Sequence, residues 1–245
     1  MSAPFLSVVI PAYNESGRLP QSLRRIHEFL SGWGRSYEVI VVDDGSRDDT
    51  ARLARESGVP GLTVIQNEGN RGKGYSVKRG MLAARGEHRL MTDADLSTPI
   101  GELPRLLAAR EQGADIVIGS RALPGANIEV HQPWYRENMG RVFNLLVRLL
   151  AVPGLRDTQC GFKLWSARAA SEAFAAARLD GFSFDVETLF VARRRGYRIL
   201  EVPVTWRNDA ATRVGMLGGF LAFPDLLRIR LNHWLGRYRA EGERP

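Results

Sequence analysis

The chain has 245 residues, which suits one large α/β domain or two small domains, and we favour a single domain. Hydrophobic residues make up 44% and charged residues 25% of the sequence, so intrinsic disorder and collagen-like structure are excluded. The single Cys excludes an intramolecular disulfide framework and an all-Cys metal cluster.

The net charge of +7 comes mainly from Arg, because only Lys73, Lys78 and Lys163 of the 34 basic residues are Lys. An Arg-biased genome explains this as well as an anionic partner does, since Arg binds phosphate through paired N–H groups. No nucleic-acid-binding motif is visible, so we expect no nucleic acid partner.

The sequence gives no sign of a membrane-spanning helix. No stretch reaches the roughly 18 apolar residues that such a helix needs. The first residues lack the basic segment and apolar core of a signal peptide. We therefore expect a cytoplasmic protein. Any membrane contact is expected to be peripheral, at the cytoplasmic face.

Strands and helices alternate over the first 120 residues. Short β-branched apolar runs predict strands at residues 6–10, 38–42, 62–66, 89–92 and 114–118. Apolar residues at helical spacing predict helices at residues 19–30, 48–56, 75–85 and 101–112. This alternation predicts a Rossmann-like α/β fold with a mixed, mostly parallel sheet flanked by helices.

The rest of the chain does not keep this rhythm. We expect helices at residues 136–152 and 183–195, and strands at residues 160–165 and 199–206. From residue 216 to residue 238, apolar residues share one helical face that is interrupted near Pro224, with Arg interleaved. Such a tail either packs on the domain or lies as an amphipathic helix on an anionic bilayer.

Four polar loops follow predicted strands, at the strand ends where open α/β sheets bind ligands. They span residues 11–15, 43–46, 70–74 and 93–99. In the last, Asp93 and Asp95 form an Asp-x-Asp pair, whose oxygens suit Mg²⁺ or Mn²⁺ shared with a substrate phosphate. Taken alone, such a tripeptide is also typical of an exposed turn.

Arg71 and Lys73 lie in a Gly-rich turn, which is typical either of a phosphate-binding loop or of a solvated one. The turn is neither Gly-x-Gly-x-x-Gly nor a Walker loop, which argues against a dehydrogenase and a P-loop ATPase.

Taken in order, these loops resemble the inverting family 2 glycosyltransferases of GT-A fold. The loops read Pro-Ala-Tyr-Asn-Glu, Asp-Asp-Gly-Ser, Asn-Arg-Gly-Lys-Gly and Asp-Ala-Asp. Motifs at residues 119–121, 157–163, 184–187 and 201–206 are similar to those of the dolichyl-phosphate β-glucosyltransferases. Related mannosyltransferases usually carry a metal-binding Gln where this chain has the shorter Ser97. The resemblance covers residues 5–235.

The resemblance implies that glucose passes from UDP-glucose to a polyprenyl phosphate with inversion, giving a β-linked product. A GDP-mannose donor, or another sugar or acceptor, stays open as an alternative. We divide the single domain into a nucleotide-sugar-binding half (1–120), an acceptor-binding half (121–210) and an amphipathic tail (211–245), for which packing on the domain and association with a membrane both stay open. The acceptor phosphate is mostly a dianion at neutral pH, so we assign no general base.

The resemblance also assigns the donor site, in which one residue of the Asp43–Asp44 pair accepts a hydrogen bond from uracil and Glu15 meets the ribose. The donor-binding residues it implies are Pro11, Ala12, Tyr13, Glu15, Asp43, Asp44, Arg71, Lys73, Asp93 and Ala94. Asp93 and Asp95 would hold Mg²⁺ or Mn²⁺ with the diphosphate, and Asp95 is the stronger ligand candidate.

Catalytic roles fall on Asp93, Asp95 and Arg121, by the same resemblance. The acceptor-binding residues it implies are Arg121, Arg136, Arg141, Asp157 and Arg213. For Arg136, Arg141 and Arg213, exposed surface charge is the alternative interpretation. Asp157 and Asp185 would orient sugar hydroxyls or arginines, or cap turns. Glu187 can equally be a helix surface residue, and we expect Cys160 to serve packing.

Overall fold

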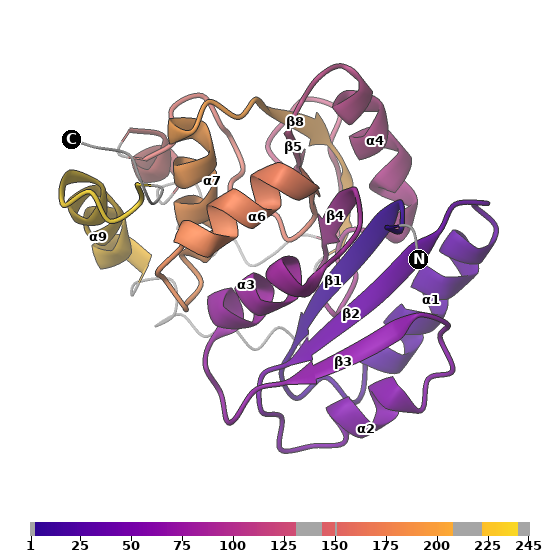
Figure 1. Cartoon of the computed structure of the whole chain (residues 1–245). Coiled ribbons are helices and arrows are strands. Elements are labelled where there is room, and N and C mark those ends of the chain that lie inside the picture. The colour runs from indigo at the N-terminus through magenta and orange to yellow at the C-terminus, as the bar shows by residue number, and fades with distance from the viewer. Residues whose placement is uncertain (1–2, 131–143, 150, 208–221, 240–245) are drawn as a thin grey trace.

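The computed structural model describes residues 3–130, 144–149, 151–207 and 222–239 (Figure 1). Its strands are β1 (Leu6–Ala12), β2 (Tyr37–Asp43), β3 (Leu62–Gln66), β4 (His88–Met91), β5 (Ile116–Ser120), β6 (Asn127–Val130), β7 (Lys163–Ser166), β8 (Ile199–Pro203) and β9 (Thr205–Arg207). Its helices are α1 (Leu19–Ser31), α2 (Thr50–Arg55), α3 (Lys73–Ala83), the 3₁₀ helix η1 (Ile100–Glu102), α4 (Leu103–Glu111), α6 (Ala167–Ala176), α7 (Phe184–Arg194) and α9 (Ala222–Trp234). Residues 144–149 are also helical.

One 7-stranded sheet in the order β3-β2-β1-β4-β7-β5-β8 joins both halves of the chain. All neighbours in it are parallel except β7, which runs antiparallel to both β4 and β5. β1, β2, β4 and β5 therefore end at the edge of the sheet where β7 begins. A separate pair, β6 and β9, lies outside this sheet.

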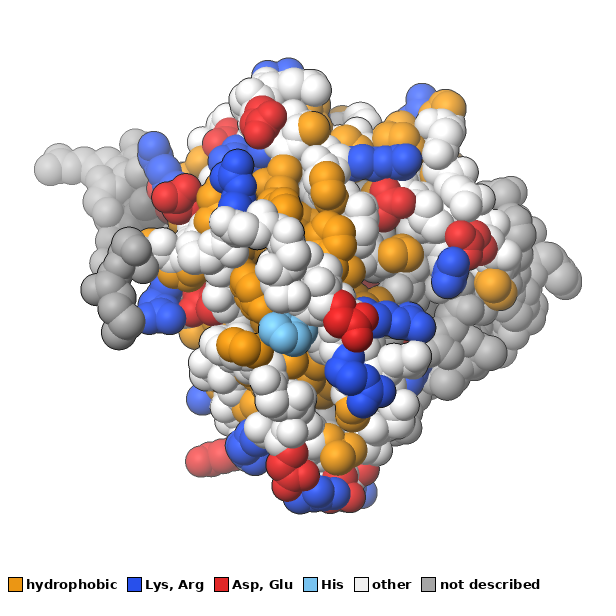
Figure 2. Space-filling model, turned by 90° about the vertical axis from the view of Figure 1, so that its right-hand side faces the viewer, with side chains coloured by type: hydrophobic (Ala, Val, Ile, Leu, Met, Phe, Trp, Pro, Cys, Tyr) orange, Lys and Arg blue, Asp and Glu red, His pale blue; other side chains and the backbone are white. Residues whose placement is uncertain are grey.

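Helices cover both faces of the sheet. α3, α6 and α7 pack against one another on one face, while α1, α2 and α4 lie on the other (Figure 1). In the view of Figure 2, basic and acidic side chains are interspersed around an apolar strip. The net positive charge is therefore not gathered into one continuous basic surface on that face.

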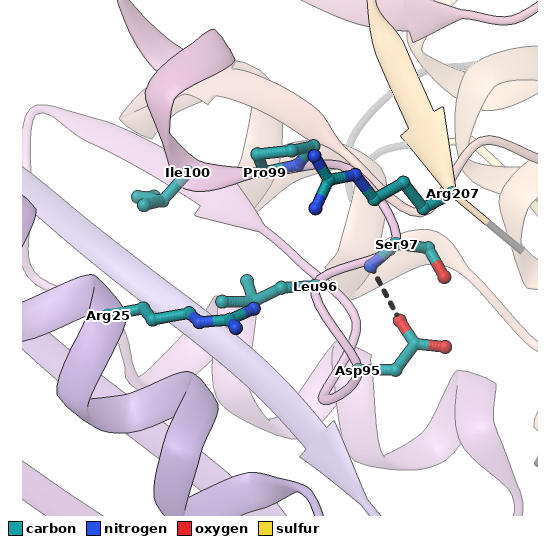
Figure 3. Close-up of a pocket in the computed structure, with 7 residues that line it drawn as sticks. All are labelled: Arg25, Asp95, Leu96, Ser97, Pro99, Ile100 and Arg207. Carbon is teal, nitrogen blue, oxygen red and sulfur yellow. Dashed lines mark hydrogen bonds between the residues drawn. The ribbon is translucent and has the colours of Figure 1, made fainter. Parts of the chain in front are cut away.

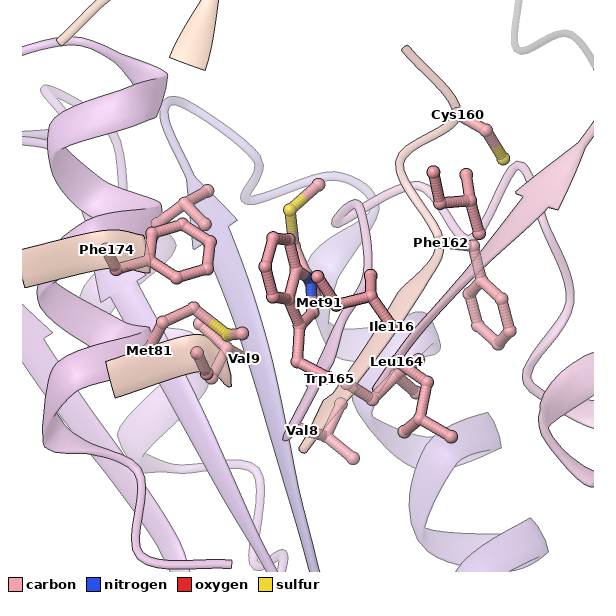
Figure 4. Packing of buried hydrophobic residues seen from close by; sticks show 14 of the residues in the cluster. Val8, Val9, Met81, Met91, Ile116, Cys160, Phe162, Leu164, Trp165 and Phe174 are labelled. Carbon is pink, nitrogen blue, oxygen red and sulfur yellow. The ribbon is translucent and has the colours of Figure 1, made fainter. Parts of the chain in front are cut away.

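The core forms where the central strands meet the helices (Figure 4). Every residue of β1 and β5 is buried, as expected for strands that are covered on both faces. Trp165 of β7 is fully buried and meets the Phe174 ring of α6 edge-on, with 5.1 Å between the ring centroids. Each such large side chain stabilises the fold by about 1.5–3 kcal/mol through removal of its apolar surface from water.

The strands and helices predicted for the first 120 residues are all present, with ends shifted by a few residues. The mostly parallel sheet is confirmed. The predicted strand at 199–206 is wrong in one respect: Pro203, which lacks an N–H group, ends β8, and β9 then pairs with β6 instead. The predicted strand at 160–165 begins only at Lys163.

Two elements went unpredicted. β6 is short and mostly exposed, so it has no buried face to produce an alternating pattern. α6 is Ala-rich, and the Ser166 side chain caps it by accepting from the Ala169 N–H, a signal that was available in the sequence. Of the predicted helix at 136–152, only 144–149 is seen as helix, and residues 131–143 and 150 lie outside the described residues.

We expect a larger side chain at Gly80 to destabilise the fold, because α3 packs closely on the sheet there. A Cβ added there would lie 2.4 Å from Cγ1 of Val9 and 2.9 Å from Cγ2 of Val42, both on buried strands. Gly80→Val should therefore lower the free energy of unfolding by about 1–3 kcal/mol, measured by urea denaturation. The matched control is Gly101→Val, whose new Cβ meets nothing within 4 Å. Equal stability of the two variants would contradict this packing.

Candidate active site

Ionic side chains gather at the edge of the sheet where the parallel strands end. Three ion pairs lie there: Lys73–Asp93, Arg121–Asp157 and Lys163–Asp185. The charges of these pairs influence one another, since Asp185 acts on the pKa of Lys73 and Lys163 acts on that of Asp157. They therefore form one cluster rather than three separate surface contacts.

The antiparallel strand β7 delivers one part of this cluster. Lys163, its first residue, lies in register between Met91 of β4 and Ile118 of β5. Its Nζ donates to the Cys160 carbonyl at 2.6 Å and to Asp185, which lies in the first turn of α7. A parallel strand in this place would carry its first residue to the opposite edge of the sheet.

Asp93 follows β4 and is held from two sides. Lys73 Nζ lies 2.7 Å from its Oδ1, and a Cβ on Gly161 would lie 1.9 Å from its Oδ2. Burial alone lowers the pKa of Lys73, but Asp93, Asp185 and Asp95 together raise it above the ordinary value. Lys73 is therefore a permanent cation at physiological pH, and the Gly in the 157–163 motif provides room for Asp93.

Asp95 differs from the other carboxylates because it forms no ion pair with the part of the chain that the structure describes. Its Oδ1 accepts from the Ser97 N–H at 2.9 Å. Burial, and then the charge of Asp93, raise the pKa of Asp95 above its ordinary value. Leu96 beside it has φ 48°, a left-handed conformation that costs a non-Gly residue about 1–3 kcal/mol. Backbone strain and a carboxylate without an ion pair among the described residues thus coincide at the Asp-x-Asp turn.

A cavity of about 270 Å³ opens beside Asp95 (Figure 3). Its lining residues are Arg25, Asp95, Leu96, Ser97, Pro99, Ile100 and Arg207. The Arg25 and Arg207 side chains reach it from α1 and β9 (Figure 3). Cations thus face the space that adjoins the unpaired carboxylate.

Arg121 follows β5 and is fixed by Asp157. Its Nε and Nη2 donate to the two carboxylate oxygens at 2.7 and 2.8 Å, and its backbone N–H donates to the same group. Its guanidinium also lies over the Trp206 ring, 5.3 Å from the centroid. Burial alone raises the pKa of Asp157, but Arg121 more than offsets this and holds the pKa below its ordinary value. The Arg121 side chain stays 26% exposed.

The predicted aspartate pair after β2 supports the neighbouring turn. Asp44 accepts from the N–H groups of Arg71 and Gly72, each at 2.9 Å, and from the Asn67 amide. Asp43 is fully buried, and its Oδ1 has no hydrogen-bond partner among the described residues. Asp44 therefore shapes the turn that carries Lys73.

The loop after β1 carries the predicted Glu15. Both oxygens of Glu15 accept from Arg18 at 2.6 Å, and the charge of Arg18 also acts on the pKa of Asp95. Asn14, at φ 54°, joins this loop to the next one by accepting from the Arg47 N–H.

The other predicted donor residues lie along the same edge. Pro11 and Ala12 are buried at the end of β1, Ala94 is buried, Tyr13 is half-buried, and Arg71 stacks on the Tyr75 ring at 4.7 Å. The structure thus brings together the predicted residues that it describes. Arg136, Arg141 and Arg213 lie outside the described residues.

The sequence alone did not single out the cations Arg18 and Lys163, and it left the role of Glu187 open. Lys163 had a signal, because Lys is rare here and this one closes a motif. The surface alternative for Glu187 is wrong, since its side chain is fully buried. Cys160 is buried as expected, and burial raises the pKa of its thiol to about 11, which suits packing rather than nucleophilic chemistry.

Comparison with known proteins shows which family this chain resembles. The family model "Glycosyl transferase family 2" matches residues 7–182. Dolichyl-phosphate beta-glucosyltransferase of Dictyostelium discoideum is 34% identical over 97% of this chain and 77% of the relative. The enzyme of that name from Homo sapiens is 36% identical over 98% of this chain and 79% of the relative.

Solved structures agree with this result at the level of the fold. Glucosyl-3-phosphoglycerate synthase from Mycobacterium tuberculosis, solved with Mn²⁺, UDP and phosphoglyceric acid, has a TM-score of 0.70 at 19% identity, covering 96% of this chain and 78% of that one. The GT-A fold expected from the sequence is confirmed. The chain belongs to glycosyl transferase family 2 and is a glycosyltransferase.

The Arg121–Asp157 pair predicts how stability depends on pH. Because the folded-state pKa of Asp157 lies below its unfolded value, the stabilisation is present above the unfolded pKa and is lost as the pH falls through the folded one. Asp157→Asn should lower the free energy of unfolding by about 3 kcal/mol at neutral pH, since it leaves a partly buried guanidinium unpaired. In urea denaturation from about pH 7 to pH 3, the free energy of unfolding of Asp157→Asn should therefore fall less steeply than that of the wild type. Asp49→Asn, at an exposed pair, is the control, and parallel acid losses in wild type and Asp157→Asn would contradict the assignment.

Proposed function

We propose, on the basis of this family membership, that the enzyme transfers glucose from UDP-glucose to a polyprenyl phosphate of the dolichyl type, with inversion. The observation that carries the proposal is the similarity, at 34–36% identity over nearly the whole chain, to dolichyl-phosphate beta-glucosyltransferases. The charge cluster supports it, because it offers cations and one unpaired carboxylate at a single edge. Glucose, rather than another hexose, rests on the relatives alone.

The donor diphosphate would lie along Lys73, Asp93 and Asp95. Within the described ranges, no group of three or more His, Cys, Asp or Glu could hold a metal ion with protein ligands alone. Asp95, whose charge is unpaired, fits Mg²⁺ or Mn²⁺ that shares its shell with substrate phosphates. Such an ion, when bound, acts as a Lewis acid on the departing UDP. Lys73 would add a fixed positive charge beside the same phosphates.

The acceptor needs positioning more than activation. A phosphate monoester has a second pKa near 6 and is a ready nucleophile at neutral pH. Arg121, already oriented by Asp157 and Trp206, would hold that phosphate through charge-assisted hydrogen bonds. Asp185 is engaged by Lys163, which fits a reaction that requires no free carboxylate as general base.

The C-terminal helix α9 supports attachment to a membrane surface, at its cytoplasmic face in our proposal. The described chain has no helix long and apolar enough to cross a bilayer. α9 buries Leu226 and Ile229 but exposes three large apolar side chains, Leu227 at 66%, Leu231 at 51% and Trp234 at 75%, and Leu235 directly after the helix is 55% exposed. Exposed Arg228, Arg237 and Arg239 accompany them. This combination fits an anionic bilayer, and Trp suits its interface. Tyr238, predicted on this face, is instead buried.

Transfer from radiolabelled UDP-glucose to dolichyl phosphate tests the activity. We expect lipid-extractable label with Mn²⁺ or Mg²⁺, and none with EDTA. Asp95→Ala should lose at least about 100-fold in rate, which corresponds to a few kcal/mol of lost charge stabilisation. Asp49→Ala, at an exposed carboxylate, should keep full activity. Label from GDP-mannose alone would overturn the donor assignment, and full activity of Asp95→Ala would overturn the metal site.

Flotation with liposomes tests the membrane surface. The wild type should float with vesicles containing phosphatidylserine at low salt and less at high salt, because exposed charges are screened. Replacing both Leu231 and Trp234 by Ser should release most of the protein, since each side chain contributes about 1.5–3 kcal/mol when it is fully buried. Leu82→Ser, at a 42% exposed apolar residue on α3, is the matched control. Undiminished flotation of the double variant would contradict the role of α9.

A further inference from the structure

Glu187 is a fully buried carboxylate in α7 that none of the proposed chemistry uses. Its Oε2 accepts from the backbone N–H groups of Arg178 and Leu179, each at 2.8 Å. Its Oε1 accepts from the Tyr238 hydroxyl at 2.6 Å. Burial raises the pKa of Glu187, and these hydrogen bonds offset only part of that effect. Burying a carboxylate costs free energy, so the hydrogen bonds that hold Glu187 indicate its role.

The segment that Glu187 holds supports the turn that carries Lys73. The Asp180 carbonyl accepts from the N–H groups of Gly74 at 2.8 Å and Tyr75 at 3.2 Å, the first amides of α3. The contact is too close for a side chain: a Cβ on Gly72 would lie 2.3 Å from the Asp180 oxygen, and one on Gly74 would lie 2.6 Å from the Leu179 oxygen. The residue between these two glycines is Lys73, the partner of Asp93.

The other oxygen of Glu187 reaches the C-terminal segment. Tyr238 follows α9, and its hydroxyl also accepts from the Asn232 amide at 3.3 Å. Phe190, one turn further along α7, meets the rings of His233 and Tyr238 edge-on at 5.4 and 6.1 Å. One carboxylate thus joins the helix with the exposed apolar face to the turn that places Lys73.

We propose that Glu187 is a positioning residue, which sets Lys73 against Asp93 through residues 178–181 and makes that placement depend on the seating of the C-terminal segment through Tyr238. The proposal rests on the donor role given to Lys73 under the proposed function. Glu187 acts in this proposal through the backbone of residues 178–180, whose Asp180 carbonyl accepts from Gly74 and Tyr75 beside Lys73.

Binding of UDP with Mn²⁺, measured by titration calorimetry on the full chain, tests this without any lipid acceptor. Lys73→Met sets the reference loss of affinity. Glu187→Met has a similar volume but no acceptor, and we expect it to weaken UDP binding by about tenfold, as expected for unsatisfied buried N–H groups. Glu187→Gln keeps an oxygen for the two N–H groups and should restore affinity to within about twofold.

Two further variants make the outcome decisive. Tyr238→Phe removes the hydroxyl that joins Glu187 and Asn232 but leaves the two N–H bonds to Glu187, so it should weaken UDP binding by about threefold, a smaller loss than that of Glu187→Met. Gly72→Ala disturbs the contact between the Asp180 carbonyl and the start of α3 from the Lys73 side. It should lose UDP affinity to a similar extent, and it keeps the test valid if Glu187→Met does not fold.

The failures of the two proposals are distinguishable. Wild-type UDP affinity in Lys73→Met would overturn the donor role of Lys73. A loss in Lys73→Met, with wild-type affinity in folded Glu187→Met or in Gly72→Ala, would overturn the positioning role of Glu187. Wild-type affinity in Tyr238→Phe would overturn the link to the C-terminal segment.

Discussion

The cost of burying charge governs this molecule. At one edge of the sheet, four carboxylates and three cations lie within electrostatic reach of one another, namely Asp93, Asp95, Asp157, Asp185, Lys73, Arg121 and Lys163. A buried charge is tolerated only when it is paired and hydrogen-bonded. Asp93, Asp157 and Asp185 meet that condition, whereas Asp95 forms no ion pair with the described residues. The unpaired carboxylate beside a cavity is where a divalent cation and a diphosphate would complete the balance.

The antiparallel direction of β7 makes this cluster of charges possible. β7 runs against its neighbours, so the loop before it arrives at the same edge as the loops that follow β1, β2, β4 and β5. This brings Asp157 to Arg121 and Lys163 to Asp185, and it places Gly161 against Asp93. The two halves of the chain therefore share one sheet and one site. Under the proposed function, an acceptor held by Arg121 would lie at the same edge of the sheet as a donor held by Lys73.

The C-terminal segment is tied to this centre through the Glu187 carboxylate and through a direct hydrogen bond from Arg178 Nε to the Arg237 carbonyl. Glu187 connects the segment 178–181, and through it the start of α3, with Tyr238 behind α9. α9 is the element whose exposed face fits a bilayer, and α3 begins at the lysine that meets Asp93. Under the proposed function, such a connection would place the proposed membrane contact and the proposed donor site in one packed unit. Packed contacts of this kind transmit displacement because protein interiors leave little free volume.

The sequence alone determined the strands and helices of the first half and the loops that carry Asp93, Asp95 and Lys73, because apolar periodicity and loop composition are local properties. Only the tertiary structure decided which charges pair. Arg121 and Asp157 lie 36 residues apart, and Glu187 and Tyr238 lie 51 apart, so their contacts depend on sheet order and strand direction. No periodicity within one segment encodes those quantities. For that reason the sequence left the role of Glu187 open, whereas the fold buries it between residues 178–179 and Tyr238.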